Sequence, residues 1–434
     1  MRNRRPLLLG LASILLLPGV TPPATASLAP SAEVTPAAAA PAHGQAGRIA
    51  IWSGSLRGRN GTSPDTTVRN IARASVDATS LRIRIGNPYG DRALHLRAGS
   101  IGLQARIGEA DLVPGSLRKL TFAGKRSITL DPGESAYSDP VALRVRAQQN
   151  VAISLYAPGA PINDQVFPPP TPNPPGSFLS LAGDHTGEPG DKAYPETNVG
   201  QNTSPGYHPG QFWWSDIVDA RSAARGTIVA LGDSNTSGHQ AIGGGDRWTD
   251  LLARELNERA PGRQLAVANA GISGNTVSRQ PNPYDPTGQC CGPPAVDRLH
   301  RDVFSVAGAK YVILFEGTND LGGGASAPQA PASRVIAALR EVADRSHARG
   351  LKVIGATLMP MCNDAGSFRE TNRLAVNEFI RTSRIFDGLI DFDAAVRDPA
   401  NPREIRPAFM ADCYHPNAAG HAAMAAAIDT GLFR

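Results

Sequence analysis

The chain of 434 residues is predicted to be an α/β protein, with a three-layer α/β/α domain built on a parallel sheet and an all-β sandwich or jelly-roll domain before it. Three observations predict this fold. Short runs of alternating apolar and polar residues occupy the first part of the chain. From Gly226 onward, longer apolar runs alternate with helical patterns. A segment dense in proline and glycine separates the two regions.

The N-terminus has the pattern of a secretory signal peptide over residues 1–26. Arginines precede an apolar run from Leu7 to Leu17, and Ala24-Thr25-Ala26 fits a cleavage site. A membrane span needs about 20 apolar residues, and this run is shorter. We therefore expect a secreted protein, extracellular or periplasmic, without stable membrane insertion.

Composition is that of a globular protein, with 41% hydrophobic and 19% charged residues. The formal net charge is +5, and it falls to about +2 when the three arginines of the expected signal peptide are removed. Such a small charge does not indicate a nucleic-acid partner.

The expected mature chain begins with a disordered Ala/Pro-rich leader over residues 27–46, which has too few large apolar residues to fold. Residues 47–157 are expected to form the β-sandwich accessory domain, because turn signals such as Asp131-Pro132-Gly133 separate short strand patterns. Residues 158–225 are expected to be a Pro/Gly-rich connector, because proline interrupts regular structure. The strands expected in the β domain span residues 81–85, 127–130, 141–145 and 151–155.

Residues 226–434 are expected to form the α/β/α domain. Its strand patterns are apolar on both faces, as in a parallel sheet covered by helices. Helical spacing occurs between them, and Gly350 provides a stop signal after one of the helices. The expected strands span residues 227–231, 265–268, 311–315, 353–358 and 389–392, and the expected helices lie near residues 248–256, 335–342 and 417–428.

Four short polar segments lie in the second half, each in a loop after an expected strand. Three of them directly follow the first, second and third strands, and the fourth precedes the closing helix. Loops at the carboxyl ends of parallel strands meet at one edge of the sheet, where sites form. The segments are Gly232-Asp233-Ser234, Asn269 to Asn275, Gly317-Thr318-Asn319-Asp320, and Asp412-Cys413-Tyr414-His415.

The residue types in these segments suit acyl transfer. A serine hydroxyl needs a base within hydrogen-bond reach, and His415 can serve Ser234 in this way. Asp412, three residues before His415, can accept a hydrogen bond from the other ring nitrogen and fix the tautomer. Taken singly, Ser234 could instead be a helix N-cap, and Gly274 and Asn319 could be ordinary turn residues.

Together the four segments resemble the blocks of the SGNH (GDSL) hydrolase family, over about half of the chain from Gly226 to Arg434. The upstream β-rich region is similar to the N-terminal module of some secreted bacterial GDSL esterases and lipases. The resemblance implies a flavodoxin-like fold, a serine hydrolase and no cofactor. It implies a catalytic triad of Ser234, Asp412 and His415, and an oxyanion hole formed by the backbone N–H groups of Ser234 and Gly274 and the side chain of Asn319.

The expected activity is hydrolysis of carboxylic esters through an acyl-enzyme, with short-acyl or carbohydrate acetyl esters favoured because no long apolar surface segment is seen. Small-molecule, lipid and polysaccharide esters all remain candidate substrates. Two other functions stay open within the family: a lipase or phospholipase, and an acyltransferase. A function of another class also stays open, a noncatalytic glycan-binding protein with a degenerate hydrolase domain.

Four cysteines remain in the expected mature chain, and export to an oxidising compartment favours disulfides. The simplest expected pairing joins the neighbours Cys290 and Cys291 to Cys362 and Cys413, because vicinal cysteines bond each other only in strained geometry. A metal site formed by Asp412, Cys413, His415 and His421 is the alternative. It leaves the first three polar segments unexplained and has no recognised zinc spacing.

Overall fold

A computed structural model describes residues 47–167, 177–197, 210–239, 247–260, 262–280, 291–322 and 329–434. The expected signal peptide and leader lie outside these residues. Among the described residues, no helix has the length and apolar character that crossing a membrane requires.

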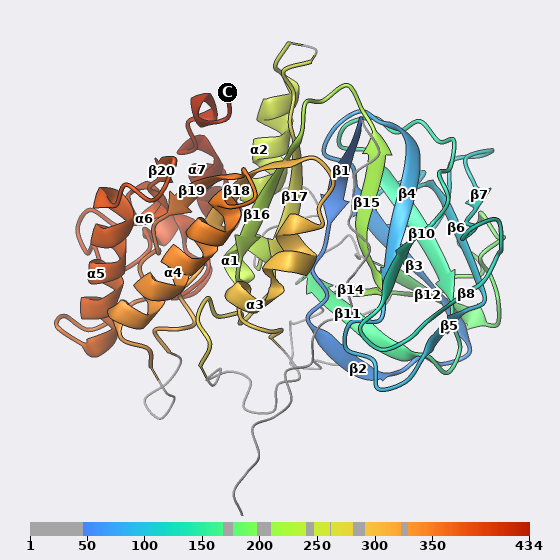
Figure 1. The fold of residues 1–434 in the computed structure, drawn as a ribbon, viewed down its shortest axis with the longest axis horizontal. Coiled ribbons are helices and arrows are strands. Elements are labelled where there is room, and N and C mark those ends of the chain that lie inside the picture. Colours follow the sequence, from blue (N-terminus) through green and yellow to red (C-terminus); the bar gives the residue numbers. More distant parts are fainter. Residues whose placement is uncertain are drawn as a thin grey trace, which may run out of the picture. The chain divides into compact units, whose positions relative to one another are not determined.

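A five-stranded parallel sheet organises the second half of the chain (Figure 1). The spatial order is β17-β16-β18-β19-β20, so the first strand along the chain lies between the second and the third. This is the flavodoxin-like order, and it confirms the predicted fold class. The strands are β16 (Thr227–Gly232), β17 (Ala266–Gly271), β18 (Ala309–Phe315), β19 (Lys352–Ala356) and β20 (Gly388–Ile390).

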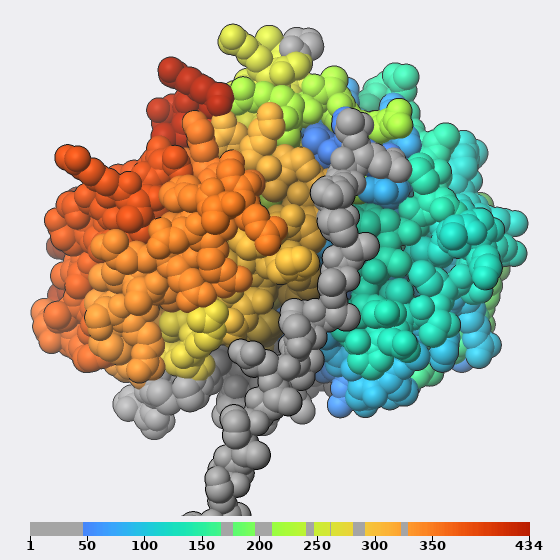
Figure 2. All heavy atoms as spheres, in the orientation of Figure 1, coloured from blue at the N-terminus to red at the C-terminus, as the bar shows by residue number. Residues whose placement is uncertain are grey.

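Helices cover both faces of this sheet. In Figure 1, α3, α4 and α5 lie on one face, and α2 and α7 pack together on the other. Side chains of the orange α4 segment cover the sheet on the side that Figure 2 presents. The helices are α1 (Ser234–Ser237), α2 (Trp248–Asn257), α3 (Ala295–Leu299), the π-helix η1 (His300–Phe304), α4 (Ala332–His347), α5 (Phe368–Thr382), α6 (Phe392–Val396) and α7 (Ala418–Ala426), with short 3-10 turns at η2 (Pro407–Phe409) and η3 (Thr430–Leu432).

The β-rich region consists of antiparallel sheets, as predicted. A four-stranded sheet, β1-β15-β4-β9, and a six-stranded sheet, β13-β12-β3-β10-β6-β7, enclose one apolar core. Smaller sheets, β14-β11-β2 and β5-β8, complete the region. The strands are β1 (Arg48–Ser53), β2 (Gly58–Thr62), β3 (Thr66–Arg73), β4 (Thr79–Gly86), β5 (Leu94–Leu96), β6 (Ala98–Leu103), β7 (Arg118–Lys119), β8 (Ile128–Leu130), β9 (Ser135–Tyr137), β10 (Asn150–Tyr156), β11 (Pro161–Phe167), β12 (Ser177–Ala182), β13 (Glu196–Thr197), β14 (Gly210–Trp213) and β15 (Ser215–Arg221).

The expectation of a connector over residues 158–225 is wrong for its described parts, which supply β11 to β15. β15 even lies between β1 and β4 in its sheet. In the sequence, Asp216 and Asp219 interrupt the apolar pattern of this strand. Both are nevertheless buried, and they form ion pairs with Arg84 and Arg48 at 2.7 and 2.8 Å. The strand expected at residues 141–145 makes only isolated bridges.

The β-rich region contacts the edge strand of the parallel sheet. Gly54 forms a parallel bridge with Asn269 on β17, and the Ser53 hydroxyl donates to the carbonyl oxygen of Asn269 at 2.9 Å. Gln165 on β11 donates to the carbonyl oxygen of Gly271 at 2.7 Å, where β17 ends. The loop that follows β17 is therefore attached to both regions.

Candidate active site

Ser234 lies directly beyond the carboxyl end of β16, the strand where the sheet order reverses. Ligands of open α/β sheets bind at this position. The Asp233 side chain caps α1 by accepting from the backbone N–H of Asn235 at 2.9 Å. Gly232 fits the tight entry to this turn, because a Cβ there would lie 2.0 Å from the Thr236 hydroxyl. Ser234 thus begins a short helix at the sheet edge.

The structure brings Ser234, His415 and Asp412 into one chain of hydrogen bonds. Ser234 Oγ lies 3.0 Å from His415 Nε2, although 181 residues separate them. His415 Nδ1 lies 2.9 Å from both carboxylate oxygens of Asp412. This geometry lets the imidazole accept a proton from the serine while the carboxylate holds the imidazole tautomer.

Asp412 is held by its own loop. Its Oδ1 atom accepts from the backbone N–H groups of Tyr414 at 2.8 Å and His415 at 2.9 Å. Partial burial by itself raises the pKa of Asp412, but the hydrogen bond and charge of His415, together with the two backbone donors, outweigh it and lower the pKa to about 2. Asp412 is therefore ionised at neutral pH.

A disulfide joins Cys362 to Cys413, with the Cα atoms 5.3 Å apart. The expected pairing of both cysteines with Cys290 and Cys291 is wrong, because the loop after β19 brings Cys362 directly to the loop that carries His415. Cys290 lies outside the described residues. The same disulfide removes Cys413 from the metal ligands considered above, because its sulfur is already bonded.

The disulfide is expected to stabilise the protein and the His415 loop. Replacing Cys362 and Cys413 together with serine should lower the free energy of unfolding by about 4 kcal/mol, as the entropy of a closed loop of this length predicts. Denaturant unfolding of both proteins measures this loss. Equal unfolding midpoints would contradict the expectation.

The segments expected to bind an oxyanion meet through Asn319. Its side-chain amide donates to the carbonyl oxygen of Asn275 at 2.8 Å and makes a long contact of 3.5 Å with Asp233. Gly274, next to Asn275, has a φ of +76°, and a Cβ there would lie 2.6 Å from the sulfur of Cys291. Glycine is thus required at position 274 by both conformation and space.

Residues 230–423 match the model of the GDSL-like lipase/acylhydrolase family. This segment is a GDSL-like domain. No curated protein matches the chain. Solved structures that are similar to it include an α/β hydrolase from the metagenome of Lake Arreo, Spain (24% identity, TM-score 0.37, covering 48% of this chain and 94% of that one). An acetylxylan esterase from Geobacillus stearothermophilus, crystallised as a catalytic mutant, has 20% identity and a TM-score of 0.36, covering 48% and 93%. A lipolytic protein of the G-D-S-L family from Veillonella parvula has 18% identity and a TM-score of 0.35, covering 46% and 94%.

Three buried carboxyl groups lie beneath the site of the GDSL-like domain. Burial raises the pKa of Asp233 to about 6, raises that of Glu316 well above its ordinary value, and raises that of Asp320. Asp320 accepts from the backbone N–H groups of Val277 and Ser278 at 2.8 and 2.9 Å. It therefore ties the loop after β18 to the loop after β17.

The raised pKa of Asp233 predicts a pH-dependent effect of Asp233→Asn. From about pH 4 to pH 6 the folded protein keeps a proton on Asp233 that the unfolded chain has lost, so this group makes the wild type less stable as pH rises. Asparagine does not titrate. The free energy of unfolding of the variant, relative to that of the wild type, should therefore rise by roughly 2 to 3 kcal/mol between pH 4 and pH 7. Chemical denaturation across this range measures the difference, and a constant difference would contradict it.

His239 lies next to the hydrogen-bond chain of Ser234, His415 and Asp412, and the predicted site residues do not include it. Its ring centroid lies 4.1 Å from that of His415. Burial and the nearby charge of His415 lower the pKa of His239 to about 3, so it is neutral at working pH. His239, Asp412 and His415 offer ligand atoms within 4.8 Å of one another, a group that could hold a metal ion. Since His415 already uses both ring nitrogens in the Ser234 and Asp412 contacts, we interpret the group as this hydrogen-bond chain with an adjacent imidazole.

Sequence reasoning also missed Arg298, which lies behind the site in α3. Its side chain is fully buried, and it forms an ion pair with Asp302 at 3.0 Å and with Glu316 at 3.1 Å. The sequence signal for its role was the oppositely charged pair Arg298 and Asp302, four residues apart within an apolar helical pattern. That signal usually marks an exposed helix face.

Proposed function

We propose that this protein is a secreted serine esterase that hydrolyses carboxylic esters through an acyl-enzyme on Ser234. The observation that carries the proposal is the hydrogen-bond chain from Ser234 through His415 to Asp412. The match of residues 230–423 to lipases and acylhydrolases supports the same reaction class. The expected signal peptide supports export.

In the first half of the proposed reaction, Ser234 Oγ attacks the ester carbonyl carbon while His415 Nε2 takes its proton. Asp412 stabilises the imidazolium that forms. The tetrahedral intermediate collapses, the alcohol leaves with the proton from His415, and the acyl group stays on Ser234. In the second half, water attacks this acyl-enzyme with His415 again acting as the base. The bond between Ser234 Oγ and the acyl carbon then breaks, the carboxylic acid leaves, and His415 returns the proton to Ser234 Oγ.

The negative oxygen of each tetrahedral intermediate would be bound by the backbone N–H groups of Ser234 and Gly274 and by the Asn319 amide. Each such donor contributes roughly 2.7 to 4 kcal/mol to transition-state stabilisation. The strong hydrogen bond to Asn275 orients the Asn319 amide. The second N–H of the same amide makes only a long and therefore weak contact with Asp233, which leaves it available to the substrate.

Short acyl chains are the proposed substrates. Within the described residues, the exposed large apolar side chains come from separate places: Ile107 and Leu181 in the β-rich region, Phe368 and Leu374 on α5, and Leu389 on β20. A protein that binds a lipid interface needs one broad apolar face, and these separate side chains do not form one.

A series of p-nitrophenyl esters with acyl chains of increasing length tests this proposal. We expect the highest kcat/KM for acetate or butyrate, and release of acetate from acetylated polysaccharide. A preference for long chains in micelles would overturn the short-acyl assignment and favour a lipase. Addition of an alcohol acceptor, followed by a search for a new ester, separates hydrolysis from acyl transfer.

A further inference from the structure

We infer that Arg298 positions the three segments of the oxyanion site, and that the β-rich region fixes Arg298 through Asp302 and Arg301. This inference rests on the proposed esterase function. It gives the β-rich region a part in catalysis, which its sequence did not suggest.

Arg298 contacts all three oxyanion segments at once. Its guanidinium donates five hydrogen bonds, and its side chain has no exposed surface. Four of the five acceptor oxygens lie at the carboxyl ends of β16, β17 and β18 or just beyond them. These are the carbonyl oxygen of Gly232 at 3.0 Å, the carbonyl oxygen of Ala270 at 2.7 Å, Asn275 Oδ1 at 2.9 Å and Glu316 Oε1 at 3.1 Å.

Each of these acceptors stands close in sequence to an expected oxyanion donor. Gly232 is two residues before Ser234, and Asn275 directly follows Gly274. The side chain of Asn275 also donates to the carbonyl oxygens of Cys291 at 2.7 Å and Pro293 at 2.9 Å, so it is held on both sides. Its carbonyl oxygen in turn accepts from Asn319. A shift of Arg298 would therefore move every donor of the site.

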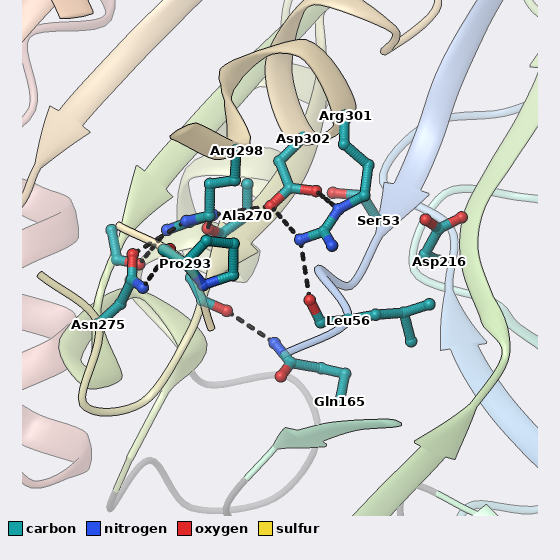
Figure 3. Close-up of polar contacts among 12 residues, drawn as sticks. Ser53, Leu56, Gln165, Asp216, Ala270, Asn275, Pro293, Arg298, Arg301 and Asp302 are labelled. Atoms are coloured by element: carbon teal, nitrogen blue, oxygen red, sulfur yellow. Dashed lines mark hydrogen bonds and ion pairs between the residues drawn. The ribbon is translucent and has the colours of Figure 1, made fainter. Parts of the chain in front are cut away.

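Asp302 connects Arg298 to Arg301 (Figure 3). Asp302 Oδ2 accepts from Arg298 at 3.0 Å and from Arg301 at 2.9 Å, and its Oδ1 accepts from Arg301 at 2.6 Å. Burial raises the pKa of Asp302, but the two arginines outweigh burial and lower it to about 2, so this carboxylate stays ionised. The helix changes from α to π at His300, between the two arginines, and π segments frequently occur at functional sites.

Arg301 reaches the β-rich region. Its guanidinium donates to the carbonyl oxygen of Leu56 at 2.8 Å, donates to the hydroxyl of Tyr89, and lies over the Tyr89 ring at 5.1 Å from the centroid. Arg84 on β4 donates to the carbonyl oxygen of Arg301 at 3.2 Å and to the Ser305 hydroxyl at 2.5 Å. Figure 3 shows the resulting line of contacts from Asn275 through Arg298, Asp302 and Arg301 to Leu56.

The arrangement has a chemical consequence. Oxyanion donors act by being fixed in place before the reaction, and a misplacement of 1 Å costs about 100-fold in rate. Arg298 touches neither Ser234 nor His415 in the described contacts. Its loss should thus weaken binding of the tetrahedral intermediate more than it weakens ground-state binding.

The test compares ester and thionoester hydrolysis by the full-length protein. A sulfur anion accepts hydrogen bonds poorly, so a well-formed oxyanion hole favours the oxygen ester. We expect Arg298→Lys to lower kcat for p-nitrophenyl acetate about 100-fold with little change in KM, and Arg301→Gln to lower it about 10-fold. Both variants should reduce the ester-to-thionoester rate ratio. Rates are divided by the number of sites that a phosphonate labels, so unfolded protein does not contribute.

Arg48→Lys is the matched control. Arg48 is also buried and forms an ion pair with Asp219 at 2.8 Å, but it contacts none of the oxyanion segments in the described structure. It should lose stability without changing kcat or the rate ratio. Wild-type rate ratios in both Arg298→Lys and Arg301→Gln would overturn the inference and leave the esterase function standing. A wild-type protein that hydrolyses neither ester would instead overturn the proposed function.

Discussion

Replacing Ser234 with alanine is expected to lower kcat by about a million-fold, because the loss of a triad nucleophile removes the covalent route altogether. The Ser234 hydroxyl oxygen lies 3.0 Å from Nε2 of His415, the proposed base. The fold should be unaffected, since alanine is compatible with the start of α1. The measurement is p-nitrophenol release from a short-acyl ester at saturating substrate.

Ser237→Ala provides the control for Ser234→Ala. Ser237 is a buried serine in the same helix, and its hydroxyl contacts the carbonyl oxygen of Ser234 and the hydroxyl of Ser273. We expect this variant to keep most of the wild-type kcat. Equal rates for the wild type and Ser234→Ala would show that another group carries the hydrolysis.

Asp412→Asn is expected to lower kcat by about 10⁴-fold. The asparagine can keep its Oδ1 contacts with the two backbone N–H groups, so its amide nitrogen then takes the place of Oδ2. This nitrogen donates to His415 Nδ1 and forces the imidazole proton onto Nε2. The imidazole can then no longer accept the proton of Ser234.

The control for Asp412→Asn is Asp429→Asn. Asp429 also accepts from the backbone N–H two residues later, at 2.8 Å, but has no histidine partner in the described contacts. Its variant should keep wild-type kcat. The Asp412 variant should also recover part of its activity as pH rises and hydroxide replaces the lost base. A loss of less than 10-fold for Asp412→Asn would contradict the assigned tautomer role.

The parallel sheet and its polar segments could be predicted because local pattern and function coincide there. Each strand is an apolar run, and Ser234, Gly274 and Asn319 follow directly. The parallel arrangement then brings loops far apart in sequence to one edge. The contact of His415 with Ser234 follows from that geometry and from the family resemblance.

The features that the sequence did not predict depend on contacts between residues that lie far apart in the chain. Asp216 and Asp219 make β15 look like a loop, because their partners Arg84 and Arg48 come from strands over 130 residues away. Arg298 looks like an exposed helix residue until the ends of three strands enclose it. The pairing of Cys362 with Cys413 likewise follows only once two loops are placed side by side.

Identification of the residue that a serine-reactive phosphonate modifies tests the central claim most directly. The protein is treated with a serine-reactive p-nitrophenyl phosphonate, digested, and its peptides are measured by mass spectrometry. One phosphonyl group should appear on the peptide that contains Ser234, and its appearance should parallel the loss of esterase activity. Label on another residue that follows the loss of activity, or full labelling of Ser234 with esterase activity intact, would contradict the account.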